Sequence, residues 1–503
     1  MDLISLIMLR MYYKFDYIKS YTLLLFFSTI SVLAEPFLAP HDPFLRHEIR
    51  LLQDEGKLDS TINDWPLNLG GLNVKNLPSK WNHNLLGNKI QDEKRAGWTP
   101  LKSKIGVSDK RITSRSFGNE PRGSFVTGLE TSWMGDYFAA NLSLSSIYGV
   151  VNDWKGRADE GLALDGSYIA ARMGNWSASL GKVDRWWGPG WDGSLILSSN
   201  ARPIPAISLD RRASEPFESK WLSWIGPWSF QSFIGQMEEE RTVPNPYLWG
   251  MRVDVNPTIL DGLEIGLFRM MQLGGDGRPE GFSTWADAFL SQDNTGANTG
   301  KDPATEPGNQ LAGLDLRWRP LDAPFAIYGQ VVGEDEDKFL PNCLMFQYGV
   351  EIWRTFPTGT GRIFLEYADL TSTWWTDDPR THNISYGHHI YSDGYRYRGR
   401  PVGHWADTDS KIISLGGYFQ NESGVGWGSI LRTGDLNEDG TGNNSVSQGI
   451  ASDYFAIEVF NSRSYSDLNL VVYTAFGWED VKVLSGSASE NGLTFSLSLT
   501  KLF

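Results

Sequence analysis

The chain has 503 residues, with 60 acidic and 45 basic side chains that give a formal net charge of −15. This charge disfavours nucleic acid as a partner, and a mean hydropathy of −0.32 without a long apolar stretch beyond the amino-terminal region excludes a helical membrane protein. A secreted soluble protein and a β-barrel both remain. The 53 glycines, 21 tryptophans and 19 tyrosines favour the barrel, because aromatic girdles lie at both of its lipid interfaces.

The amino terminus has the features of a secretory signal peptide. Two lysines precede an apolar run from Tyr21 to Leu33, which suits a signal-peptide core but is too short to span a bilayer as a helix. Ala34 lies at the small-residue position before a cleavage site, so we expect residues 1–34 to be the signal peptide. Glu35 follows instead of a cysteine, which disfavours a lipoprotein anchor.

Residues 35–115 are expected to form a small helical segment on the periplasmic side. Asp42-Pro43 is typical of a helix start, since the carboxylate can cap the first turn and proline fits the first helical position. Leu45, Ile49 and Leu52 then fall on one helical face. The segment is too small to hold a large core alone.

From residue 116 to residue 503 the sequence predicts strands, because apolar and polar residues alternate with a period of two. Ile363 and Leu365, for example, alternate with Arg362 and Glu366, which indicates a lipid-facing side and a polar lumen. At roughly ten residues per strand plus connections, this length predicts an all-β, transmembrane antiparallel β-barrel of about 16–18 strands. Three stretches are too rich in Gly, Pro, Asn and Asp for strands and are expected to be long loops: 185–222, 272–308 and 373–408.

The last predicted strand, Leu493–Phe503, alternates apolar residues with serine and threonine and ends in an aromatic residue. A terminal strand of this kind resembles the assembly signal of bacterial outer-membrane β-barrels. We therefore expect the protein to lie in the bacterial outer membrane, with outer-membrane lipid and the barrel assembly machinery as partners.

The densest motif is the run Asp-Arg-Trp-Trp-Gly-Pro-Gly-Trp that ends at Trp191. Trp186, Trp187 and Trp191 could stack on sugar rings, while Arg185 and Arg202 could bind carboxylates with two parallel hydrogen bonds. The alternative is a structural loop whose tryptophans pack inside the barrel. The residue types alone leave both interpretations open.

This run, together with Ser-Leu-Ile-Leu-Ser-Ser-Asn-Ala-Arg-Pro-Ile-Pro up to Pro205, closely resembles the signature of the Wzi family of capsule assembly proteins. The amino-terminal residues Leu45–His47 and Trp65–Leu67 resemble the same family, as does the block Gly394–His404. The resemblance implies an outer-membrane barrel that holds capsular polysaccharide at the cell surface.

The block Gly394–His404 interleaves tyrosines with Arg396, Arg398 and Arg400. On a strand, the tyrosines would share one face and the arginines the opposite face, a layout that suits an acidic glycan. The alternative is an arginine ladder on the lumen wall that pairs with acidic residues.

Metal binding and catalysis find little support in the sequence. Asp435–Gly440 resembles the first half of a calcium loop, but Val446 stands where the loop needs its glutamate, and a turn explains the segment equally well. Cys343 is the single cysteine, so no disulfide within the chain is possible. No serine lies in a Gly-x-Ser-x-Gly turn, and we expect no catalytic residues, no metal and no cofactor.

The leading hypothesis is a non-enzymatic lectin that binds and anchors capsular or other extracellular polysaccharide and assists capsule assembly. The family resemblance implies an acidic ligand, and the expected contacts are Arg185, Trp186, Trp187, Trp191, Arg202, Arg396, Arg398 and Arg400. The alternative is a porin or export channel for saccharides, since barrels of this size can leave an aqueous pore. An outer-membrane enzyme is a third class, for which the sequence offers no nucleophile.

Overall fold

The computed structural model describes residues 37–72, 96–109, 113–118, 120–149, 160–289, 308–320, 323–337, 340–372, 383–442, 444–447, 449–484 and 489–503. The chain divides into two units, Met1–Val32 and Leu33–Phe503, and all described residues belong to the second unit. The predicted signal peptide therefore lies outside the described residues, as do parts of the predicted loops 272–308 and 373–408.

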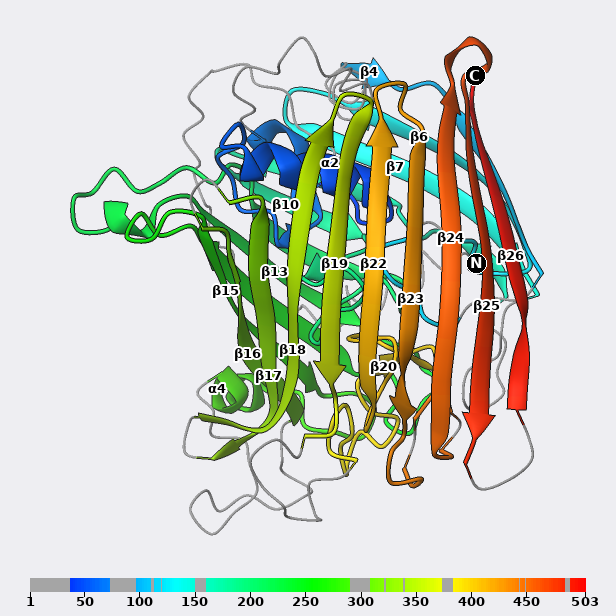
Figure 1. The fold of residues 1–503 in the computed structure, drawn as a ribbon. Coiled ribbons are helices and arrows are strands. Elements are labelled where there is room, and N and C mark those ends of the chain that lie inside the picture. Colours follow the sequence, from blue (N-terminus) through cyan, green and yellow to red (C-terminus); the bar gives the residue numbers. More distant parts are fainter. Residues whose placement is uncertain are drawn as a thin grey trace, which may run out of the picture. The chain divides into compact units, whose positions relative to one another are not determined.

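The second unit is a closed antiparallel β-barrel (Figure 1). Among the described residues the barrel has 18 strands, because β4 and β5 share one position in the wall and β8 and β9 share another. Leu502 pairs with Lys102, and this antiparallel pair of the last and first long strands closes the sheet. The predicted fold class is confirmed.

The strands of the wall are β4 (Gly97–Trp98), β5 (Lys102–Ser108), β6 (Phe125–Met134), β7 (Phe138–Tyr148), β8 (Gly161–Ala163), β9 (Tyr168–Met173), β10 (Trp176–Gly181), β12 (Ala206–Arg211), β13 (Trp228–Gln236), β14 (Tyr247–Val255), β15 (Leu263–Leu273), β16 (Gly308–Trp318), β17 (Phe325–Asp337), β18 (Leu340–Phe356), β19 (Gly359–Asp369), β22 (Lys411–Asn421), β23 (Gly426–Leu436), β24 (Ser452–Tyr465), β25 (Leu470–Val483) and β26 (Ser489–Leu502). Strands β4 and β5 lie before residue 116, so the barrel starts earlier in the chain than the sequence predicted. The reason is that β5 carries two lysines, two serines and a glycine, which hide its alternation. Strand β12 likewise lies within the predicted loop 185–222.

The two faces of the wall differ in polarity as the alternation predicts. On β19, Ile363 and Leu365 are exposed on the outer face, whereas Arg362 and Glu366 are buried on the inner face. An outer belt of apolar side chains suits lipid, and the inner charged groups require partners inside the barrel. The polar lumen expected from the sequence is confirmed.

The helix α2 (Pro43–Asp54) lies inside the barrel, near the end at which the carboxy terminus lies (Figure 1). Its start is the predicted one, since the Asp42 carboxylate accepts hydrogen bonds from the N–H groups of Phe44 and Leu45. Leu45, Ile49 and Leu52 pack in one buried cluster with tryptophans from other segments. The apolar face found in the sequence therefore packs within the lumen.

The polar side of α2 binds the inner face of the wall through buried ion pairs. Asp54 receives Arg317 and Arg362, each at 2.8 Å, and these two arginines also hold Glu351, each at 2.6 Å. Arg50 pairs with Glu264 at 3.2 Å. Pairing offsets part of the cost of burying these charges and fixes the helix in the lumen.

The two ends of the barrel differ in the length of their connections. At the end with the carboxy terminus, strands join through short turns such as 357–358, 422–425 and 466–469. At the opposite end the connections are long, among them 274–307, 370–410 and 437–451. We refer to these as the turn end and the loop end.

Other elements complete the described part of the chain. Outside the wall lie the strands β1 (Phe37–Leu38), β2 (Asp64–Trp65), β3 (Leu67–Asn68), β11 (Trp186–Trp187), β20 (Arg396–Tyr397) and β21 (Arg400–Pro401), and the helix α4 (Phe282–Phe289). Among the described residues, no helix is both long and apolar enough to cross a membrane.

We expect Arg362→Ala to destabilise the protein strongly. The substitution leaves Asp54 and Glu351 buried with one cation fewer, which costs on the order of 3–5 kcal/mol. Chemical unfolding in lipid bilayers measures the free energy of unfolding. The control is Arg354→Ala, which removes an exposed arginine from the neighbouring strand β18. Equal stability of the two variants would contradict the role assigned to this ion-pair network.

Candidate functional site

The connection between β10 and β12 enters the lumen, and we call its residues 182–205 the tryptophan loop. Strand β11 within it pairs with β2, so that Trp186 lies opposite Trp65. Trp186, Trp187 and Trp191 are fully buried. The loop is thus bound to the amino-terminal segment and its rings face other protein groups.

Trp191 packs among aromatic side chains of the wall. Its ring stacks on Phe364 with centroids 6.1 Å apart and lies 5.2 Å from the ring of Tyr418. Its indole N–H donates to Glu351 at 2.8 Å, while its backbone N–H donates to Glu366 at 2.8 Å. The ring therefore has no free face for a sugar.

The guanidinium of Arg46 joins α2 to the tryptophan loop. It lies 4.5 Å from the ring centroids of Phe117 and Trp191, and it donates to the carbonyl oxygens of Gly190 at 2.8 Å and Pro189 at 3.2 Å. Burial, followed by the nearby Arg50, lowers the pKa of Arg46 to about 9. The group remains a cation at neutral pH, so cation–π attraction and hydrogen bonds to the carbonyl groups act together.

The second motif lies in a segment that also folds into the barrel, residues 383–410, which we call the tyrosine loop. Tyr395 donates to the carbonyl oxygen of Ile196 at 2.9 Å, and Tyr386 donates to that of Leu195. Ser198 N–H donates to the Val402 carbonyl at 2.9 Å. The two motifs, about 200 residues apart in sequence, thus form one hydrogen-bonded unit.

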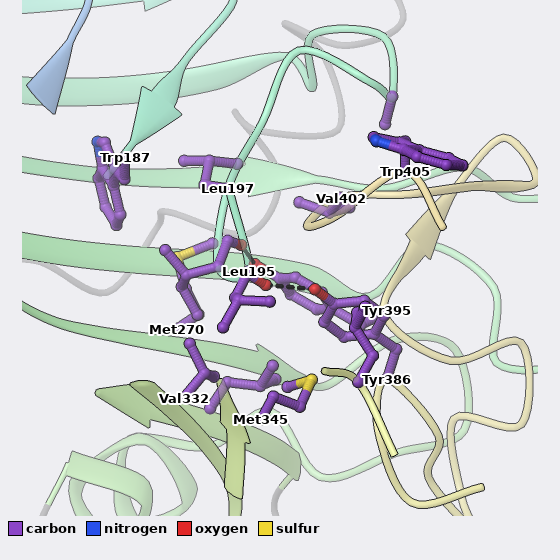
Figure 2. Packing of buried hydrophobic residues seen from close by; sticks show 14 of the residues in the cluster. Trp187, Leu195, Leu197, Met270, Val332, Met345, Tyr386, Tyr395, Val402 and Trp405 are labelled. Atoms are coloured by element: carbon purple, nitrogen blue, oxygen red, sulfur yellow. Dashed lines mark hydrogen bonds between the residues drawn. The ribbon is translucent and has the colours of Figure 1, made fainter. Parts of the chain in front are cut away.

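An apolar core fills the space between the two loops and the wall (Figure 2). The side chains in it come from the tryptophan loop, the tyrosine loop and the inner faces of the strands, and those labelled in Figure 2 are Trp187, Leu195, Leu197, Met270, Val332, Met345, Tyr386, Tyr395, Val402 and Trp405. The loops approach closely: a side chain at Gly193 would have its Cβ only 2.0 Å from the His404 ring. Glycine at position 193 is therefore required by space.

Five of the eight predicted contact residues are buried within this unit: Arg185, Trp186, Trp187, Trp191 and Arg396. Arg396 holds Asp407 with two hydrogen bonds of 2.8 and 2.7 Å. Arg185 lies 4.4 Å from the ring centroid of Phe233 and donates to the Val183 carbonyl at 2.9 Å. In this geometry these five side chains hold the two loops in place.

The other three predicted contacts can be reached by solvent. Arg398 is exposed at the tip of the β20–β21 hairpin, where its φ of 50° and the φ of 77° at Gly399 form the turn. Arg400 is half-buried and donates to the Asn200 side chain at 2.9 Å. Arg202 is more deeply buried, with 10% of its side chain exposed, and its guanidinium holds Asp165 at 2.7 and 3.1 Å.

Two small cavities adjoin Arg202 and Arg400. One is lined by Asp184, Arg185 and Arg202, among others. The other is lined by Arg115, Glu120, Arg400, Glu458 and Ser496. Each has a volume of about 20 Å³, which is room for about one water molecule.

The cavities contain groups that sequence reasoning missed. Arg115 and Glu120 carry no motif, and only the fold of the chain brings them beside Arg400. Burial alone would raise the pKa of Asp184, but His41 at 2.9 Å and Arg122 at 3.2 Å outweigh it and lower this pKa to about 2. Asp184 is therefore a fixed anion at one cavity wall.

Metal binding was considered for Asp435–Gly440 from the sequence. In the part of the chain that the structure describes, no group of three or more His, Cys, Asp or Glu side chains could hold a metal ion. Asp439 instead accepts hydrogen bonds from Thr441 within its own turn and from Asn383 of the tyrosine loop.

Comparison with known proteins identifies relatives of the whole barrel. The family model of Capsule assembly protein Wzi matches residues 103–490. A Klebsiella pneumoniae protein, described as a 55.8 kDa protein in the cps region, is 33% identical over 325 residues, which cover 62% of this chain and 61% of that protein. The match thus spans about three fifths of that relative's length.

Among solved structures, the Escherichia coli protein Wzi superimposes with a TM-score of 0.77 at 25% identity, over 93% of this chain and 99% of that protein. It is described as an outer-membrane protein involved in group 1 capsule assembly and as a carbohydrate-binding β-barrel. The family resemblance and the outer-membrane location expected from the sequence are confirmed.

We expect Trp191→Ala to lower the free energy of unfolding by about 3–5 kcal/mol, because it leaves a cavity and removes an indole donor from Glu351. Arg398→Asn serves as the control, since asparagine tolerates positive φ and the side chain is exposed. Its effect should stay within about 0.5 kcal/mol. Chemical unfolding of both variants in bilayers makes the comparison, and a stable Trp191→Ala variant would contradict the buried role of this ring.

The burial of His404 predicts a contribution to acid sensitivity. Burial lowers the pKa of His404 to about 4, against about 6.5 for an unfolded histidine. The stabilisation is complete above pH ~6.5 and is lost as the pH falls towards ~4, because only the unfolded chain gains a proton in this window.

We therefore expect the stability of the wild type to fall relative to that of His404→Asn by about 1.4 kcal/mol per pH unit between pH ~6.5 and ~4. Unfolding midpoints measured across this range test the difference. Parallel pH profiles for His404→Asn and the wild type would be inconsistent with the buried neutral imidazole.

Proposed function

Because the chain belongs to the Wzi family of capsule assembly proteins, we propose that it binds polysaccharide and anchors capsular or other extracellular polymer at the cell surface. The E. coli member of the family is described as carbohydrate-binding. Binding here requires no turnover: the protein acts as a lectin that helps to assemble the capsule.

The observation that carries this proposal is the meeting of the two motif loops beside the reachable arginines Arg202, Arg398 and Arg400. Short turns face the periplasm and long loops face outward in barrels of this class, which places the long connections of the loop end outside the cell. Arg202 and Arg400 each line one of the small cavities, and Arg398 is exposed beside Arg400. These cations suit an acidic polymer, because charge-assisted hydrogen bonds to carboxylates are strong and directional. We propose these three as direct contacts.

We propose an indirect role for the five buried motif residues. Arg185, Trp186, Trp187, Trp191 and Arg396 hold the loops that present the reachable arginines. The contact between each reachable arginine and a sugar is weak on its own. Retention of the polymer would come from many repeat units and many copies of the protein acting together. A single deep site is then unnecessary.

A porin-like channel has less support from the geometry. A water-filled pore needs solvated side chains along its wall, whereas Gln330, Glu351 and Glu366 on the inner face bind the tryptophan loop and are buried. Conductance in planar bilayers separates the two functions, since steady open pores would favour the channel. We further propose that the terminal strand β26 is recognised by the barrel assembly machinery.

We expect the double variant Arg398→Asn/Arg400→Gln to release polymer without reducing its synthesis. In a deletion strain carrying this variant, total polysaccharide should stay constant while the surface-bound fraction falls and the shed fraction rises. Purified variant in nanodiscs should bind polymer from the parent strain at least about tenfold more weakly, because each charge-assisted contact is worth about 1.5 kcal/mol. The exposed Arg354→Ala variant, at the turn end, is the matched control.

Other outcomes distinguish an error in the proposed contact residues from an error in the proposed function. If deletion of the protein lowers the surface-bound fraction but the double variant does not, the contacts lie elsewhere on the loop end. If deletion abolishes polymer production itself, an export role replaces the anchor. If deletion changes neither quantity, the proposed function is wrong.

A further inference from the structure

One connection at the turn end is much longer than its neighbours. Residues 212–227 join β12 to β13 and include the short 3-10 helix η2 (Ser223–Ile225). Figure 1 shows this green segment projecting sideways beyond the barrel wall, near the end where the carboxy terminus lies. We call it the lateral flap.

The lateral flap exposes a cluster of large apolar side chains. Trp221 is 87% exposed, and Leu222 and Trp224 are also exposed. The adjacent turn between β14 and β15 adds Ile259, which is 76% exposed, and Leu260. Five such side chains on two neighbouring connections form a patch of the kind that marks an interaction site.

Hydrogen bonds hold the flap against this turn. The Trp224 carbonyl accepts from the backbone N–H of Thr258 at 2.9 Å. Gly226 has a φ of 70°, and a Cβ there would lie 1.9 Å from the Asn256 carbonyl oxygen. The two connections therefore touch through their backbones, which keeps the apolar side chains turned away from the protein.

The base of the flap is also fixed. Phe217 stacks on Trp228, the first residue of β13, with centroids 4.8 Å apart and planes at 11°. The Arg211 guanidinium lies 3.8 Å from the Trp228 ring centroid and donates to the carbonyl oxygens of Ala213 at 2.6 Å and Glu215 at 3.0 Å. A segment built in this way presents its tryptophans in a defined position.

We propose that the lateral flap lies in the headgroup region of the membrane and anchors the turn end of the barrel to phospholipid. The flap continues an established lipid-facing surface, since Ile207 and Leu209 on the outer face of β12 lead directly to it. Tryptophan prefers the boundary between headgroups and acyl chains, where its ring is in an apolar layer and its N–H meets water. A projection sideways from the wall runs along the membrane surface, as an interfacial segment does.

The apolar patch of the lateral flap thus contacts lipid, and this anchor lies on one side of the barrel. Short turns mark this end as the periplasmic one, so the lipid is phospholipid of the inner leaflet. The flap would resist tilting of the barrel when a polymer pulls on the loop end.

The test places a fluorophore on the flap in a bilayer. Trp221→Cys in a Cys343→Ala background is labelled with an environment-sensitive nitrobenzoxadiazole dye and reconstituted as single barrels in phosphatidylethanolamine/phosphatidylglycerol nanodiscs. We expect lipid spin-labelled near the headgroup to quench the dye at least twofold more than lipid labelled near the chain end. Aqueous iodide should quench it at most half as well as it quenches a dye at Ser423→Cys, an exposed turn at the same end of the barrel.

Each alternative result overturns the proposal. Equal iodide quenching at positions 221 and 423, without dependence on the depth of the spin label, would mean that the patch faces water and awaits a protein partner. Strong quenching only by the deep spin label would mean that the flap is buried in the acyl chains. If Cys343→Ala hinders folding, the native Cys343 can stay, because it is buried and protected from the dye. A second dye at Ile259→Cys must report the same depth.

Discussion

The interior of this barrel depends on the guanidinium of Arg46, which joins α2 to the tryptophan loop and to the ring of Phe117. The backbone carbonyl groups of residues 188–190 receive N–H groups of its two terminal nitrogens, and three rings pack around it. Its Nε–H has no hydrogen-bond partner among the described residues. A buried cation is costly unless its donors are satisfied. The sharp Gly-Pro-Gly turn at residues 188–190 supplies the acceptors in one place, and this explains why a glycine- and tryptophan-rich run serves the fold.

The same constraint shapes the inner wall. Alternation gives the lumen a charged surface, yet the loops that fill it bring an apolar core with them. This conflict is resolved because wall carboxylates accept hydrogen bonds from the backbone of the tryptophan loop. Glu366 accepts from the backbone N–H groups of Trp191 at 2.8 Å, Asp192 at 3.2 Å and Gly193 at 3.1 Å. Glu366 and Glu351 are thereby matched to specific atoms of the loop, which fixes the register of the loop in the barrel.

The sequence predicts the parts of this structure that depend on local pattern. The period-two alternation gives the wall, and Asp42-Pro43 gives the start of α2. Prediction from the sequence fails where contacts between segments far apart in the chain determine the local structure. Strand β5 is too polar to be recognised alone and is a strand because β26 and β6 pair with it. The tryptophans could have been a sugar platform or a core, and only contacts such as that from Trp191 to Glu351, 160 residues away, decide between them. The cavity at Arg400 likewise needs residues from six separate strands and loops.

The interactions that hold the barrel together differ in strength from the proposed contacts with polymer. The barrel is held by closed strand pairing, buried ion pairs and a wide apolar belt in lipid, all of which are lost only on unfolding. The proposed contacts with polymer are a few reachable arginines at the loop end, each worth little alone. Under load, the bond between protein and polymer must therefore yield long before the barrel leaves the membrane. An anchor built in this way can release or exchange polymer without loss of the protein, provided that enough copies share the load.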